Sequence, residues 1–155
     1  MRKTVACLAM LLILALARCA GESPGFAADT LPPIPPGQAR IFFYRWLEPY
    51  EALSMSTIYL NGIPVGVSQT GAVLYRDVAP GQYYISVDSQ GTYPDQFKTV
   101  TIAAAQTVDV RIESISSFKS PCGYLGNCEV DTFVVTIVDP ATASREMRAL
   151  KLIPG

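Results

Sequence analysis

The sequence predicts an all-β protein that folds as a single β-sandwich of about eight strands with one short C-terminal helix. Three observations support this fold class. Short runs rich in β-branched and aromatic residues follow one another from residue 39. Several of these runs alternate strictly between apolar and polar residues, which is the period of a half-buried strand. Turn-forming residues separate them at close spacing.

The expected strands are, in chain order, residues 41–44, 56–60, 63–67, 72–78, 83–88, 99–102, 108–113 and 133–138. Asn61-Gly62 connects the second of these to the third and predicts a two-residue hairpin turn, because both residue types tolerate positive φ. Pro64 predicts that the third strand lies at an exposed edge, because proline cannot donate a hydrogen bond to a neighbouring strand.

Burial is expected to follow the alternation. Ile85 and Val87 share a phase with Tyr83, so one of the two tyrosines at 83 and 84 should point inward. Residues 133–138 form a continuous apolar run instead, which predicts a central strand that is covered on both faces.

One helix is expected after residue 139. Asp139 is a good N-cap and Pro140 suits the first helical position. Ala143, Met147 and Leu150 then fall on one face, which predicts a short helix that packs on the sheet.

Residues 1–18 are predicted to be an export signal. Arg2-Lys3 precedes an apolar run over residues 5–17, which is shorter than the roughly 20 residues that a membrane-spanning helix needs. The body of the protein is therefore expected to be exported, to the periplasm or the outer membrane.

Cys19 directly follows this leader and is a candidate for lipidation of the bacterial lipoprotein type. Arg18 occupies a position where such processing normally requires a small residue. Ordinary cleavage after Ala17, or later near Ala27, is the competing interpretation. Membrane attachment is thus expected only through a lipid on Cys19 or through a partner.

The remaining chain divides into residues 19–38, a proline-rich linker, and residues 39–155, the β-sandwich domain. Pro32-Pro33 and Pro35-Pro36 favour extended polyproline geometry, with no periodic apolar pattern to bury. If Cys19 is lipidated, the linker would tether the domain to the membrane. If it is not, the linker would be a proline-rich N-terminal arm.

Cys122 and Cys128 bracket a turn-rich loop, and in an oxidising compartment they predict a local disulfide. Two free buried thiols are the alternative. No metal site is expected, because two thiols without any histidine do not complete a tetrahedral zinc shell.

The absence of histidine also excludes serine–histidine and cysteine–histidine nucleophilic sites, and no phosphate-binding or dinucleotide motif is present. We therefore predict no catalytic residues and no cofactor. With 12 basic and 13 acidic residues and no basic run outside the leader, nucleic acid is not an expected partner. Two pairs of carboxylates are interpreted as solvated or turn residues. As catalytic pairs they would instead indicate a carboxylate-dependent enzyme that acts on an envelope polysaccharide, which is the alternative interpretation. The pairs are Asp88 with Asp95, and Glu129 with Asp131.

Aromatic residues in and beside loops are the candidate binding residues. Tyrosine and tryptophan at a sheet rim suit stacking on sugar rings or anchoring of a protein partner. The candidates for binding an envelope protein or glycan are Trp46, Tyr50, Tyr93 and Tyr124.

The order of the turns also resembles a known family. A strand that ends in Tyr59-Leu60-Asn61-Gly62 is followed by Pro64-Val65-Gly66 and then by a strand closed by Val78-Ala79-Pro80-Gly81. This order resembles the PEGA modules of bacterial envelope proteins. With residues 39–45 ahead of it, the chain is similar to a domain-of-unknown-function family of small bacterial secreted proteins and lipoproteins.

The resemblance covers about residues 37–113. It implies an Ig-like or PEGA-like sandwich and a non-catalytic module in the cell envelope. A purely structural accessory subunit is a further alternative.

Overall fold

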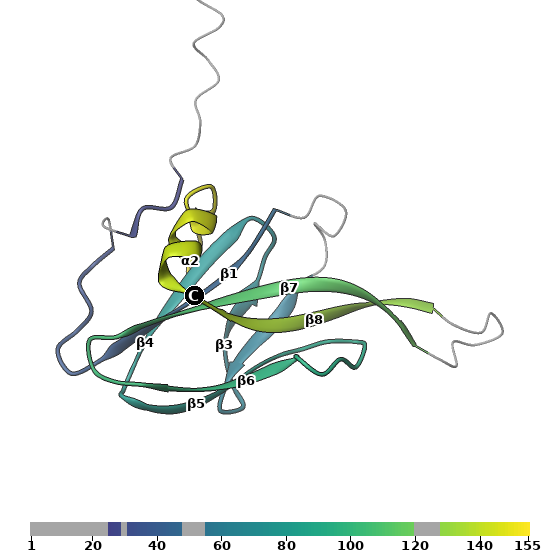
Figure 1. Ribbon diagram of the computed structural model, residues 1–155, viewed down its shortest axis with the longest axis horizontal. Coiled ribbons are helices and arrows are strands. Elements are labelled where there is room, and N and C mark those ends of the chain that lie inside the picture. Colours follow the sequence, from purple (N-terminus) through teal and green to yellow (C-terminus); the bar gives the residue numbers. More distant parts are fainter. Residues whose placement is uncertain (1–24, 29–30, 48–54, 120–127) are drawn as a thin grey trace, which may run out of the picture.

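The computed structural model describes residues 25–28, 31–47, 55–119 and 128–155. The predicted all-β fold is confirmed, because these residues form two packed sheets and one short helix (Figure 1). The strands are β1 (Ala39–Arg45), β2 (Ser56–Leu60), β3 (Ile63–Ser68), β4 (Ala72–Val78), β5 (Gly81–Val87), β6 (Phe97–Ile102), β7 (Thr107–Lys119), β8 (Cys128–Val138) and β9 (Lys151–Leu152).

One sheet has five strands in the order β8-β7-β1-β4-β9, and the other has four in the order β3-β2-β5-β6. The four-stranded sheet is antiparallel throughout. In the five-stranded sheet, β1 pairs in parallel with β7, and β4 in parallel with β9. Strands far apart in the sequence therefore lie side by side in this sheet.

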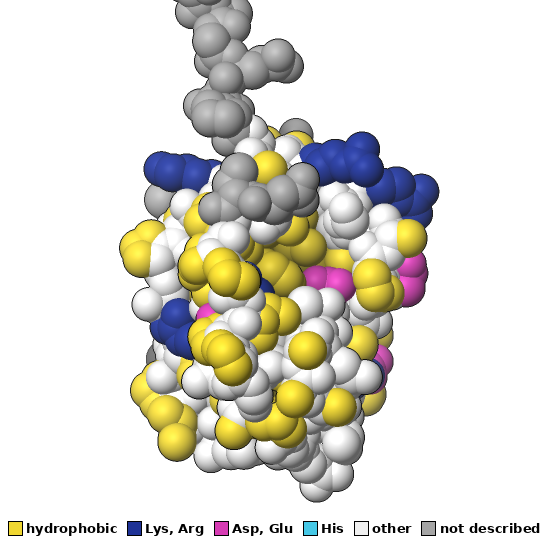
Figure 2. Space-filling model, turned by 90° about the vertical axis from the view of Figure 1, so that its left-hand side faces the viewer, with side chains coloured by type: hydrophobic (Ala, Val, Ile, Leu, Met, Phe, Trp, Pro, Cys, Tyr) yellow, Lys and Arg dark blue, Asp and Glu magenta, His cyan; other side chains and the backbone are white. Residues whose placement is uncertain are grey.

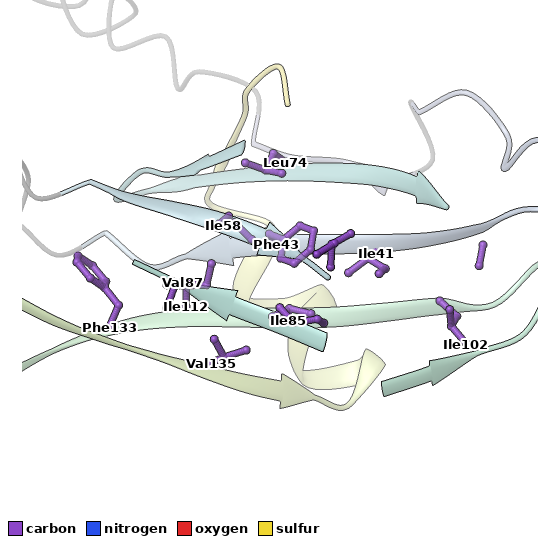
Figure 3. Packing of buried hydrophobic residues seen from close by; sticks show 13 residues of the cluster. Ile41, Phe43, Ile58, Leu74, Ile85, Val87, Ile102, Ile112, Phe133 and Val135 are labelled. Carbon is purple, nitrogen blue, oxygen red and sulfur yellow. The ribbon is translucent and has the colours of Figure 1, made fainter. Parts of the chain in front are cut away.

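The main core lies between the two sheets, where branched and aromatic side chains from both inner faces interlock (Figure 3). On β5, Ile85 and Val87 are buried and Tyr83 packs against this core, while Tyr84 is exposed. The expected alternation is confirmed.

The hairpin between β2 and β3 is also confirmed. Asn61 and Gly62 both have positive φ, 52° and 78°, as this turn type requires. β3, which carries Pro64, lies at the edge of its sheet as expected.

The prediction that residues 133–138 form a central strand is wrong. They belong to β8, which lies at the edge of the five-stranded sheet, and Ile137 is 41% exposed. The strand covered on both faces is β1, in which all seven residues are buried. An apolar run reports how well the faces of a strand are covered. It does not report whether neighbours pair on both sides, so it cannot separate an edge strand from a central one.

The predicted helix is confirmed as α2 (Pro140–Met147). The side chain of Asp139 accepts a hydrogen bond from the Thr142 N–H at 3.0 Å and so caps its N-terminus. Ala143 and Met147 are buried against the outer face of the five-stranded sheet. Within the described residues, no helix has the length and apolarity needed to cross a membrane.

Part of the proline-rich segment also packs on this outer face. Phe26 is buried, its ring meets that of Phe42 edge-on at 5.8 Å, and its N–H donates to the Leu150 carbonyl at 2.8 Å. The Pro32 carbonyl accepts a hydrogen bond from Arg40 at 2.9 Å. Residues 19–38 are predicted to be a linker with no periodic apolar pattern to bury, yet Phe26 within this segment is buried. A single aromatic residue produces no periodic pattern, and its burial depends on contacts distant in sequence.

Candidate binding surfaces

Several predicted residues lie outside the part of the chain that the structure describes, namely Cys19, Tyr50, Cys122 and Tyr124. Cys128 begins β8, where its backbone pairs with that of Lys119. The disulfide with Cys122 stays a prediction.

Trp46 and Tyr93 are described, and they lie in different surroundings. Trp46 follows β1, and the guanidinium carbon of Arg111 lies 4.3 Å from the centre of its ring. Tyr93 is exposed in the β5–β6 loop, where its N–H donates to the Gln96 side chain at 3.0 Å. No ring contact between these two side chains occurs in the described ranges. A binding role for either stays a prediction.

Arg111 ties Trp46 to a polar network on the outer face of the five-stranded sheet. The guanidinium pairs with Glu146 of α2 at 3.1 Å and with Glu113 of β7 at 3.1 Å. The Tyr44 hydroxyl donates to the same Glu146 carboxylate at 2.5 Å. Trp46 is thus held in place on one side by a charge-assisted network.

Two groups of this network, Arg111 and Tyr44, have a raised pKa. Burial alone would lower the pKa of Arg111, but the hydrogen bond and charge of Glu146, together with Glu113, raise it overall. Burial raises the pKa of Tyr44, and the hydrogen bond that it donates to Glu146 raises it further. Neither group exchanges a proton near neutral pH, so the network suits positioning rather than acid–base chemistry.

The outer face of the four-stranded sheet differs in character. Strand pairing places ten residues on it, and none of them carries a charge. We call these ten residues the bare face, since no helix or other described segment is seen to cover them (Figure 1). They are Thr57, Tyr59, Pro64, Val67, Gln82, Tyr84, Ser86, Phe97, Thr99 and Thr101.

Tyr84 of β5 and Phe97 of the edge strand β6 form an aromatic pair on the bare face. Their rings stack with centroids 5.1 Å apart and an interplanar angle of 28°. They nevertheless remain 42% and 50% exposed, respectively. The hydroxyl of the neighbouring Tyr59 donates to Asp88 at 2.9 Å, which fixes that ring at the end of the sheet.

Sequence reasoning identified Tyr84 as a candidate outward residue but missed Phe97 and Tyr59. The alternation of side chains along the strands could have identified both residues. Phe97 lies at an outward position of β6, as Thr99 does, and Tyr59 lies at an outward position of β2. Loop position identified the exposed Trp46 and Tyr93, and strand phase is needed in addition to find Phe97.

The candidate carboxylates are mostly dispersed. Asp95 forms an exposed ion pair with Lys98 at 2.6 Å, while Asp88 and Asp131 line an open hollow of about 310 Å³ beside Phe133. The side chain of Glu129 is outside the described set. Over the described ranges, no three acidic or cysteine side chains come close enough to hold a metal ion.

Comparison with known families confirms the resemblance to PEGA modules. Residues 54–115 match the family model of the PEGA domain, a span that contains β2 to β6 and most of β7. β1, β8, α2 and β9 lie outside the matched residues. PEGA domains occur in exported and periplasmic proteins, in agreement with the predicted export. No curated protein and no solved structure matches the chain.

Proposed function

We propose that this chain is an exported, non-catalytic module of the cell envelope that binds a glycan through the bare face. The observation that carries the proposal is the exposed Tyr84–Phe97 stack on β5 and β6, on a sheet face whose ten strand positions carry no charge. Aromatic rings present apolar faces on which the C–H faces of sugar rings can stack.

The composition of the bare face favours a glycan over a charged ligand. Hydroxyl and amide groups of Gln82, Thr99 and Thr101 flank the aromatic pair and are exposed. Such groups donate and accept hydrogen bonds with sugar hydroxyls. A nucleic acid or an acidic peptide would instead require basic side chains, and the ten positions contain none.

A direct test measures retention of the full chain on isolated peptidoglycan sacculi. The Tyr84→Ala/Phe97→Ala double variant should bind at least about 10-fold more weakly, which corresponds to about 1.4 kcal/mol. Leu152→Ala removes an exposed apolar side chain from the other sheet and should bind as the parent does. Trp46→Ala tests the alternative surface around Arg111.

Unchanged retention of the double variant would refute the proposed site. Sacculi stripped of attached protein by protease separate the two classes of partner. Loss of retention after stripping would identify an envelope protein as the partner and contradict glycan binding.

We further propose that a lipid on Cys19 anchors the module at the membrane. Phe26 is docked on the sandwich, so residues 19–25 alone would link the anchor to the fold. Such a segment spans at most about 20–25 Å. The intact mass of the mature protein tests this proposal. An N-terminus at Cys19 with added acyl mass supports it, and cleavage elsewhere without added mass contradicts it.

A further inference from the structure

A pocket of about 540 Å³ lies between α2, the segment Phe26–Ala28 and the strands β1 and β7. Six of its ten lining residues are apolar, Phe26, Phe42 and Met147 among them, and the four polar ones are Thr107, Asp109, Ser144 and Arg148. The side of the molecule shown in Figure 2 is hollowed, with hydrophobic side chains and an acidic group inside the hollow. This volume suits a small organic molecule.

Asp109 is the exceptional group in this pocket. It projects from β7 on the face opposite the main core and is only 6% exposed. Within the described residues, no hydrogen bond to its carboxylate and no ion pair with it are present. A buried carboxylate without a partner is costly, since desolvation of a charge requires compensation.

The charged groups around Asp109 do not provide that compensation. Asp139 adds a repulsive negative charge, while Arg111 is engaged by Glu113 and Glu146. Arg148 lines the same pocket, but it is exposed and forms no ion pair with Asp109 in the part of the chain described.

The N-terminus of α2 does not supply a donor either. Pro140 has no N–H, and the Thr142 N–H is already donated to the Asp139 carboxylate. Burial first and the charge of Asp139 second raise the pKa of Asp109 to about 6, as expected for a carboxylate without a cationic partner.

We propose that this pocket binds an organic ammonium ion with an apolar body, whose N–H groups donate to the Asp109 carboxylate. The cation supplies the missing charge partner, and the apolar walls take up the hydrocarbon part. A hydrated metal ion fits less well, because it prefers several oxygen ligands and Asp109 is the single carboxylate in the lining of this pocket.

This site is separate from the bare face and does not depend on glycan binding. Most of its walls come from residues 26–28, β1 and α2, which lie outside the matched PEGA residues. Only Thr107 and Asp109 come from within them.

The test titrates the full chain with n-hexylammonium at pH 8 by calorimetry, with n-hexanol and hexanoate as neutral and anionic controls of the same length. The ammonium ion should bind, and Asp109→Asn should weaken it at least about 10-fold. Hexanol should bind weakly and equally to both proteins. Asp95→Asn, which alters an exposed carboxylate, should bind as the parent does.

Acidification provides an independent readout. Lowering the pH from 8 to 5 protonates about nine-tenths of a carboxyl with a pKa near 6, so the affinity for hexylammonium should fall about 10-fold in the parent and not in Asp109→Asn. The proposal is overturned by no binding of hexylammonium to the parent, or by equal binding to Asp109→Asn. Thermal unfolding of the variant verifies that it is folded.

Discussion

The two outer faces of this sandwich differ in whether other segments of the chain cover them. The outer face of the five-stranded sheet is covered by α2 and Phe26, which bury Phe42 and Tyr44 in a second apolar cluster. The outer face of the four-stranded sheet is bare, and its two stacked rings, Tyr84 and Phe97, remain about half exposed. Both faces carry aromatic residues at outward strand positions, so the difference lies in what covers them.

The contrast indicates a division of roles. On the covered face, the buried aromatic rings and the Arg111–Glu146 network contribute to stability, because the loss of a contact that is shielded from water lowers the free energy of unfolding. On the bare face, the same residue types leave apolar surface in water, which favours a binding role.

Phenylalanine truncation on the two faces gives the largest contrast. Phe42→Ala should lower the free energy of unfolding by about 3–5 kcal/mol, because a buried ring is replaced by a cavity. Phe97→Ala should lower it by less than about 1 kcal/mol, because half of its ring already faces solvent. Urea unfolding of both variants measures the difference. Equal losses would show that the bare face is part of the folded core.

Asp109→Asn should stabilise the protein at pH 8, by up to about 3 kcal/mol, because it removes a buried charge whose pKa is raised from 3.8 to about 6. The folded state binds this proton more tightly than the unfolded state. The parent therefore gains stability as the pH falls through 6, about 1.4 kcal/mol by pH 5 from this group. The advantage of the variant should shrink accordingly in unfolding curves at the two pH values. A constant difference would mean that Asp109 does not titrate in this range.

Glu146→Gln should lower the free energy of unfolding by about 1.5–3 kcal/mol, because it removes the charge that pairs with Arg111 and accepts from Tyr44. Asp95→Asn breaks an exposed ion pair with Lys98 and serves as the matched control, with a loss of less than about 0.5 kcal/mol. Chemical denaturation measures the loss of unfolding free energy in the two variants. Equal small losses would show that the network is effectively solvated.

The smallest effect is expected from a double-mutant cycle on Tyr84 and Phe97. Their coupling in the unfolding free energy should be below about 1 kcal/mol, because the stack is exposed. A coupling well above that value would assign the pair a structural role.

Local features of this fold could be predicted from the sequence. Asn61-Gly62 predicts a turn with positive φ, and the alternation around Ile85 predicts a strand with one buried face. Each of these features depends on only a few consecutive residues. The capped helix after Asp139 is local in the same sense.

Features that depend on distant contacts could not be predicted. The parallel pairing of β1 with β7, the edge position of β8 and the burial of Phe26 arise from chain segments that meet only in the fold. Alternation places Asp109 opposite the main core, but it does not reveal that α2 and Phe26 enclose that side chain. For the same reason, the absence of a cover over Tyr84 and Phe97 is visible only in three dimensions.

The most direct test of the division between the two faces is an NMR titration of the full chain with soluble peptidoglycan fragments, monitored at backbone amides. We predict that chemical-shift changes cluster on β2, β5 and β6, around Tyr84 and Phe97, and leave α2 unaffected. Changes centred on α2, or none at all at millimolar fragment, would contradict the account.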